Sequence, residues 1–155
     1  MFFVLFASIL LATALAHPTG APTEACDSMT PDHGVNPEST QLPNTISLDK
    51  TDLKAKDKLK ILIEGPPFRG FLAEVRKQGS DEAVGKFIAD EGQHTINCHN
   101  NKDSAITQSG RELKDKVTLI WEAPDETGDY DVFITIVETK EKFWAKQKVS
   151  SIKVV

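Results

Sequence analysis

From residue 45 onward, the chain is a series of short segments rich in Ile, Val, Phe and Thr, separated by polar turns. Segments of this length and composition are typical of β-strands. We expect strands at residues 58–64, 68–76, 116–122, 130–138 and 143–149, with residues 150–155 extending the last of them. The only plausible helix is a short one at residues 80–84. Closely spaced strands without intervening helices predict an all-β, antiparallel β-sandwich, with Trp121 and residues 132–137 in its core.

Ahead of these segments, residues 17–45 form a stretch rich in Pro, Thr, Ser and Asn, which we call the N-terminal lead. Proline lacks a backbone N–H and fixes φ, so we expect no regular helix here. The prolines are Pro18, Pro22, Pro31, Pro37 and Pro43. Cys26 lies within the lead, so we expect this segment to be tied to the core.

The chain begins with an uncharged apolar run, residues 2–15, that is too short to span a bilayer of about 30 Å as a helix. It ends in Ala14-Leu15-Ala16, a small-x-small pattern that signal peptidase accepts. The pattern predicts a signal peptide at residues 1–16 and cleavage before His17, although a basic n-region is missing. A buried N-terminal helix is the alternative. No second apolar run approaches membrane length, so we expect a secreted chain without a transmembrane segment.

Secretion gives the two cysteines of the sequence, Cys26 and Cys98, a specific meaning. An even number of cysteines in an oxidising compartment favours a disulfide between them. A pair of metal ligands, with His94 and His99 nearby, is the competing interpretation. It is the weaker one because structural zinc sites need four ligands at tight spacing.

The charge balance and the missing motifs exclude several classes of function. The chain has 18 Lys and Arg against 23 Asp and Glu, a net charge of −5, so it is a poor general binder of nucleic acid. No nucleophile elbow, phosphate-binding loop, dinucleotide fingerprint or zinc-protease motif is present. The acidic turn 125–129 lacks the alternating ligands of a calcium loop. We therefore expect no enzyme activity, no catalytic residue, no cofactor and no metal.

Lysines recur at every second position in two segments, which places each set on one face if the segment is extended. Such faces, one of them carrying a tryptophan, suit the anionic phosphorylated glycolipids of microbial surfaces. A solvated outer face, or lysines that protect an edge strand from aggregation, is the alternative. The two sets are Lys54, Lys56, Lys58 and Lys60, and Lys140, Lys142, Lys146 and Lys148 with Trp144 in the missing place.

An ordered set of landmarks covers essentially the whole chain after the signal peptide. They are Ala25-Cys26 with Met29-x-Pro31-x-His33, the run Phe68-Arg69-Gly70-Phe71 and the strand after it, Val84-Gly85-x-Phe87, Cys98, Trp121-x-Ala123-Pro124, Gly128 and Phe143-Trp144. This order resembles the reeler (reelin-type) domain, and the resemblance implies an immunoglobulin-like β-sandwich over residues 17–155. Two positions depart from the family pattern. Gln108 stands where a histidine is expected, and Lys56-Asp57-Lys58 replaces a Tyr-Pro-Gly turn.

Single-domain, secreted reeler proteins are similar to the insect defence proteins of haemolymph, which are induced by infection and implicated in haemocyte nodulation. The resemblance therefore implies a non-enzymatic innate-immune protein, a monomer that recognises microbial surfaces. Its expected partners are lipopolysaccharide, lipoteichoic acid, β-glucan and haemocyte surfaces. An interaction module of extracellular matrix or egg coat, without a microbial ligand, is the alternative. We do not expect a redox-associated domain like that of the ferric-reductase relatives, because no haem-bearing membrane helices follow.

Arg69, between two aromatic residues, is one further candidate for contact with a ligand. An exposed arginine there could bind an anion by charge and stacking. In the alternative interpretation, Gly70 permits a close approach of neighbouring groups and the phenylalanines belong to the core.

Overall fold

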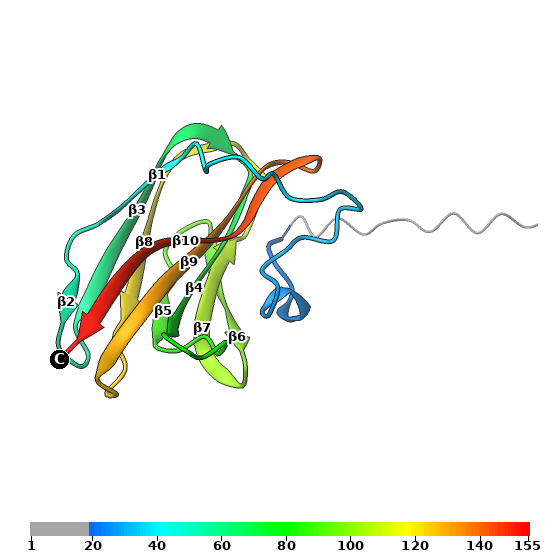
Figure 1. The fold of residues 1–155 in the computed structure, drawn as a ribbon. Helices are drawn as coiled ribbons and strands as arrows, with labels where there is room; N and C mark the ends of the chain where they lie inside the picture. The colour runs from blue at the N-terminus through cyan, green and yellow to red at the C-terminus, as the bar shows by residue number, and fades with distance from the viewer. Residues whose placement is uncertain (1–18) are drawn as a thin grey trace, which may run out of the picture.

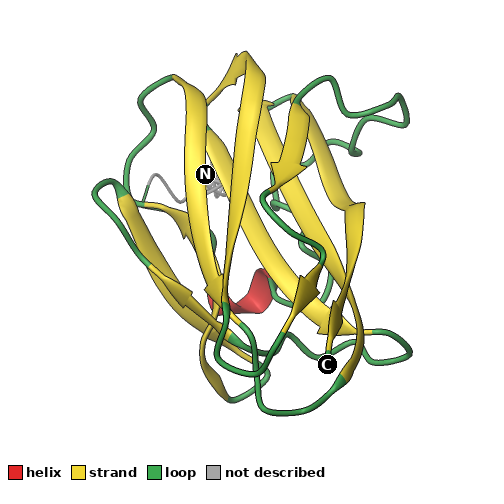
Figure 2. Ribbon diagram, turned by 90° about the vertical axis from the view of Figure 1, so that its left-hand side faces the viewer, coloured by secondary structure: helices red, strands yellow, loops and turns green. Residues whose placement is uncertain are grey.

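The computed structural model describes residues 19–155 and consists of two packed β-sheets (Figures 1 and 2). A four-stranded sheet has the order β1-β3-β8-β5, and a six-stranded sheet has the order β2-β10-β9-β4-β7-β6. All pairs are antiparallel except β2 with β10. The strands are β1 (Thr45–Leu48), β2 (Asp52–Leu53), β3 (Lys58–Phe68), β4 (Gly70–Lys77), β5 (Lys86–Ile88), β6 (Gln93–Cys98), β7 (Asn101–Gln108), β8 (Lys114–Glu122), β9 (Gly128–Thr139) and β10 (Lys142–Val154). The expected immunoglobulin-like sandwich is confirmed.

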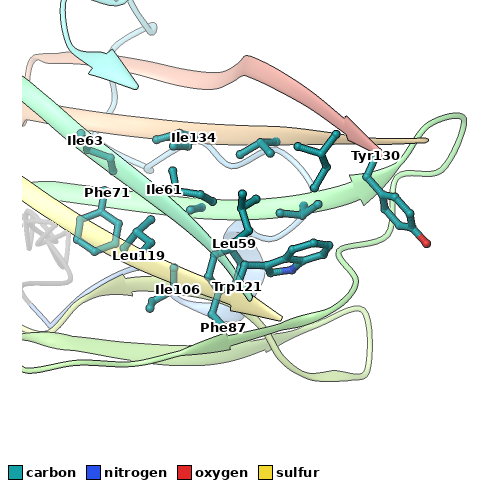
Figure 3. Packing of buried hydrophobic residues seen from close by; sticks show 14 of the residues in the cluster. Leu59, Ile61, Ile63, Phe71, Phe87, Ile106, Leu119, Trp121, Tyr130 and Ile134 are labelled. Atoms are coloured by element: carbon teal, nitrogen blue, oxygen red, sulfur yellow. The ribbon is translucent and has the colours of Figure 1, made fainter. Parts of the chain in front are cut away.

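The main core lies between the two sheets (Figure 3). On β3, Leu59, Ile61 and Ile63 point inward and are fully buried, while the alternating lysines of the strand are exposed. This is the period-two pattern of a strand with one buried face. As expected, Trp121 is fully buried, and its Nε1 donates to the carbonyl oxygen of Val84 at 3.0 Å.

A second, smaller cluster lies on the outer face of the six-stranded sheet, where the N-terminal lead covers it. Figure 1 shows the lead, in blue and cyan, beside this sheet and near the end of the β9–β10 hairpin. Met29 of the lead is 1% exposed, and Leu72 of the sheet is 3% exposed. Because β4 has the core on one face and the lead on the other, residues 70–76 are all buried. The disulfide between Cys26 and Cys98 lies in this cluster and joins the lead to the end of β6.

The sequence predictions agree with the long strands and differ elsewhere. All five expected strands are present, mostly with longer bounds, but β1, β2, β5, β6 and β7 were not predicted. The expected helix at 80–84 is wrong, since Ala83 is instead bridged to Arg76 of β4. The only helical turn in residues 19–155 is a 3₁₀ turn at Thr23–Ala25, inside the lead. The predicted signal peptide lies outside the described residues. Within them, no helix has the length and apolar character to cross a membrane.

Candidate functional site

A cavity of about 690 Å³ is bounded by the lead on one side and by the outer face of the six-stranded sheet on the other. Ala21, Met29 and Pro31 line it from the lead, and Leu72 and Val137 line it from the sheet. These side chains are apolar, and a cavity of this size is in the range of small-molecule sites, about 300–1,000 Å³. The cavity is therefore the strongest candidate for a binding site in the described part of the chain.

Three cationic side chains line the same cavity from the loops at one end of the sheet. Arg69 lies between β3 and β4, Arg111 between β7 and β8, and Lys140 between β9 and β10. All three are exposed, and none forms an ion pair with another residue of the range 19–155. We call these three residues the cationic rim. Glu24 and Asp32 line the cavity from the lead, so the sheet side of the opening is basic and the lead side is acidic.

Lys114 holds two loops of the cationic rim together. Its Nζ donates to the carbonyl oxygens of Arg69, Gly110 and Glu112 at 2.8, 3.0 and 2.8 Å, which uses all three of its N–H groups. Arg69 adds a hydrogen bond from Nη1 to the carbonyl oxygen of Arg111 at 3.0 Å. Burial lowers the pKa of Lys114, as does the charge of Arg69, against the opposite effect of Glu112. The rim is therefore held by a side chain that the sequence analysis did not single out.

Gln108, the residue that replaces the family's histidine, lines the cavity beside the rim. Its Oε1 accepts a hydrogen bond from the backbone N–H of Phe71 at 2.8 Å. A Cβ atom at Gly70 would lie 2.9 Å from Nε2 of Gln108, closer than such contacts occur in proteins. Gly70 therefore permits a close approach and Phe71 belongs to the core, as the alternative interpretation of this run predicted. Arg69 is nevertheless exposed at the cavity.

The lead is anchored beneath the disulfide by a buried ion pair on β4. Arg76 donates from Nε and Nη2 to Oε2 of Glu74 at 2.9 and 2.7 Å, and from Nη2 to the carbonyl oxygen of Cys26 at 2.7 Å. Both side chains are almost completely buried. Burial raises the pKa of the Glu74 carboxyl, against the hydrogen bond and charge of Arg76, which lower it. The two cysteine sulfurs are bonded to each other, so neither is a thiolate that could bind a metal.

His99, next to the disulfide, forms a second link between the lead and the strands. Its Nδ1 lies 2.9 Å from the backbone N–H of Ala83 and accepts from it, which leaves Nε2 to donate to Asp27 at 2.8 Å. His33 similarly joins the lead to the β9–β10 turn, with Nδ1 at 2.9 Å from the carbonyl oxygen of Lys140. These contacts hold the lead at the middle and at the C-terminal end of the segment, residues 20–33, that lines the cavity.

The first lysine set is not a single face. Lys54 and Lys56 lie in the turn between β2 and β3, where Lys56 has a φ of 69°. Only Lys58 and Lys60 extend outward from a strand, on the outer face of the four-stranded sheet. The segment is not extended throughout, so these four lysines do not share one face.

The second lysine set is interrupted as well. The pairing of β10 with β9 shifts between Trp144 and Gln147 and again after Lys148, and Lys146 has a φ of 48°. Trp144 is 3% exposed and donates from Nε1 to Thr40 of the lead at 3.1 Å, because the lead crosses the strand here. Lys142 and Lys148 form ion pairs, with Glu138 and Asp131. Of the ten candidate ligand-binding residues, only Arg69 and Lys140 line the cavity.

Comparisons with known proteins agree with this architecture. The Reeler domain model matches residues 24–155. "Putative defense protein 3" of Antheraea mylitta is 36% identical over 152 residues, which cover 93% of this chain and 91% of that protein. "Putative ferric-chelate reductase 1" of Xenopus laevis is 33% identical over 151 residues, but the match covers only 25% of that protein. The crystal structure of the human F-spondin reeler domain superposes with a TM-score of 0.62 at 16% identity, covering 78% of this chain.

The fold and the disulfide-anchored lead thus define an immunoglobulin-like β-sandwich with one covered outer face. The chain belongs to the Reeler domain family. Among its relatives, proteins named for defence match over nearly their whole length, whereas the ferric-chelate reductases match over about a quarter of theirs.

Proposed function

We propose that this protein is a secreted, non-enzymatic defence protein that recognises anionic components of microbial surfaces at the cationic rim. The names and coverage of the defence relatives support the defence role. The observation that carries the ligand class is the gathering of Arg69, Arg111 and Lys140 around one cavity. These three cations line one cavity and form no ion pair within residues 19–155, and their combined positive charge favours an anionic ligand.

Lipopolysaccharide and lipoteichoic acid are the ligands that fit this chemistry best, because both carry phosphate groups. β-Glucan is uncharged, so it offers no anionic group for the cationic rim to bind. Apart from Lys140, the interrupted lysine sets do not contribute to the proposed site: Lys142 and Lys148 are paired with carboxylates, and Trp144 is buried.

The test is co-sedimentation of the purified protein with intact bacteria of both Gram types at low and at physiological salt. A triple variant, Arg69→Gln with Arg111→Gln and Lys140→Gln, should bind about tenfold more weakly, if each exposed charge contributes about 0.5 kcal/mol. Binding by the wild type should weaken as salt rises, because charges are screened over about 8–10 Å.

A matched control removes three other exposed lysines, Lys54, Lys58 and Lys60, and so changes the net charge equally on a different face. This variant should bind like the wild type. If the wild type binds neither type of bacterium, the proposal is refuted, and a matrix or egg-coat module is favoured instead. Equal losses in both variants would show that binding follows net charge and not the rim.

A further inference from the structure

Besides the cationic rim, the cavity has a largely apolar lining. Ala21 and Met29 from the lead, and Leu72 and Val137 from the sheet, line it. Met29 and Leu72 are almost completely buried, so this wall is fixed by packing against the sheet and does not depend on a mobile surface side chain. A ligand that only met the rim would leave this apolar space without an occupant.

Three polar side chains that line the cavity already form hydrogen bonds within the protein. Thr107 accepts from the N–H of Ala21 at 3.0 Å, and Thr135 donates to the carbonyl oxygen of Met29 at 2.6 Å. Gln108 accepts from Phe71. These hydrogen bonds join the lead to the sheet and leave an interior with little capacity to bind a sugar ring, which would need several buried donors and acceptors.

A cavity lined by both apolar and cationic side chains matches a molecule with an apolar chain and an anionic head. We propose that the cavity binds one acyl chain of an anionic amphiphile, whose head group lies at Arg69, Arg111 and Lys140. The inference rests on the proposed function in one respect, because the same cationic rim binds the ligand in both. It adds that recognition reaches the lipid part of that ligand and not only its charged surface.

The first test is a chain-length series of free fatty acids, from butyrate through octanoate to dodecanoate, titrated calorimetrically into delipidated protein below their micelle-forming concentrations. Affinity should rise about fourfold for each methylene group that enters the cavity, from about 0.8 kcal/mol per buried methylene. It should level off when the chain fills the space. An affinity that does not change from butyrate to dodecanoate would overturn the inference.

The head group is tested at constant chain length with dodecanoate, dodecanol and dodecylamine. The basic rim on the sheet side predicts the order dodecanoate, then dodecanol, then dodecylamine. If the acidic Glu24 and Asp32 on the lead side dominated, the amine would bind best. Equal affinities for the acid and the alcohol would show an apolar cavity without head-group recognition, and would overturn the assignment of an anionic ligand.

Two variants locate the binding. Val137→Phe adds bulk to a half-buried wall residue and should lower the affinity for dodecanoate at least tenfold, while Ile88→Phe, on an exposed strand of the other sheet, should not. Should Val137→Phe fail to fold, the double variant Arg111→Gln with Lys140→Gln gives the second measurement, since both residues are exposed. It should remove most of the preference for dodecanoate over dodecanol, and an unchanged preference would place the head group elsewhere.

These outcomes separate the inference from the proposed function. Dodecanoate binding without binding to bacteria would refute the proposed function and leave the cavity assignment intact. Rim-dependent binding to bacteria, with no chain-length dependence and no effect of Val137→Phe, would refute only the cavity assignment.

Discussion

Arg76 attaches the lead to the sheet by hydrogen bonds, next to the disulfide. Its side chain is 2% exposed and donates to Glu74 and to the carbonyl oxygen of Cys26. Replacement by methionine keeps most of the volume but leaves the carboxyl group of Glu74 buried without its partner. Removal of one member of a buried ion pair costs about 3–5 kcal/mol, so Arg76→Met should lower the free energy of unfolding by this amount.

The double variant Glu74→Leu with Arg76→Met should be much less destabilised than Arg76→Met alone. Replacing a buried pair by apolar groups is often neutral, and the remaining loss is the unpaired carbonyl of Cys26, about 1–3 kcal/mol. Urea denaturation of the wild type, both single variants and the double variant gives the coupling energy, which should exceed about 2 kcal/mol.

Lys148→Met breaks an ion pair between an exposed lysine and the partly buried Asp131 and is the control, with an expected loss of no more than about 1 kcal/mol. If the losses of stability in the two single variants simply add in the double variant, the two residues are not coupled.

The pKa of Glu74 allows a second test of the pair. A raised folded pKa gives stability that is fully present below the ordinary value of 4.5 and is lost as pH rises through the folded value, so Glu74→Gln should flatten stability over that range.

Three further predictions concern other contacts of the described structure. Replacing Cys26 and Cys98 by alanine opens a loop with a sequence separation of 72 and should cost about 4 kcal/mol, seen as a drop in Tm of more than about 10 °C by circular dichroism; a drop below about 5 °C would contradict it. Trp144→Ala should lose about 3–5 kcal/mol of stability in urea, and a variant as stable as the wild type would mean an exposed tryptophan. Burial raises the pKa of Asp131, but hydrogen bonds from Ser151, Gln78 and Lys148 outweigh it and hold this pKa below its ordinary value of 3.8. The ionised carboxylate of Asp131 therefore stabilises the fold above that value, and this stabilisation is lost as pH falls. Asp131→Asn should make the free energy of unfolding depend less on pH in the acid range. An unchanged pH dependence would refute this contribution.

Strands with one buried face were predictable because their side chains alternate. Leu59, Ile61 and Ile63 repeat at every second position, and β3 follows from them directly. Strands β6 and β7 were missed because their sequences are polar. On β7, Thr107 is buried where Ala21 of the lead donates to it, and Ser104 is buried where it bonds to the backbone of Cys98. That burial arises from contacts between distant parts of the chain.

The wrong helix at 80–84 has a similar cause. Local composition favours a turn of helix, but Val84 donates from its N–H to the carbonyl oxygen of Val75, and Ala83 donates to His99. These tertiary hydrogen bonds hold the segment in an extended form beside β4.

The candidate site was only partly predictable for the same reason. Arg69 and Lys140 were singled out from sequence, and the fold brings them to one cavity. Arg111 lies in an ordinary polar loop and Lys114 begins β8, and neither carries a local signal. The bulges of β10 cannot be deduced from the spacing of its lysines. Trp144 is buried by Thr40, which is 104 residues away along the chain. The period-two spacing of the lysines therefore does not show which side chains of β10 are exposed.

The central claim is that microbial surfaces are recognised at the rim and cavity beneath the lead. Hydrogen–deuterium exchange of the protein, alone and bound to bacteria, tests it most directly. We predict slower exchange at four segments that line the cavity, residues 20–33, 69–72, 107–111 and 135–140, and unchanged exchange on the outer face of β3 and β8. Protection confined to β3 and β8, with no change in these four segments, would contradict the account.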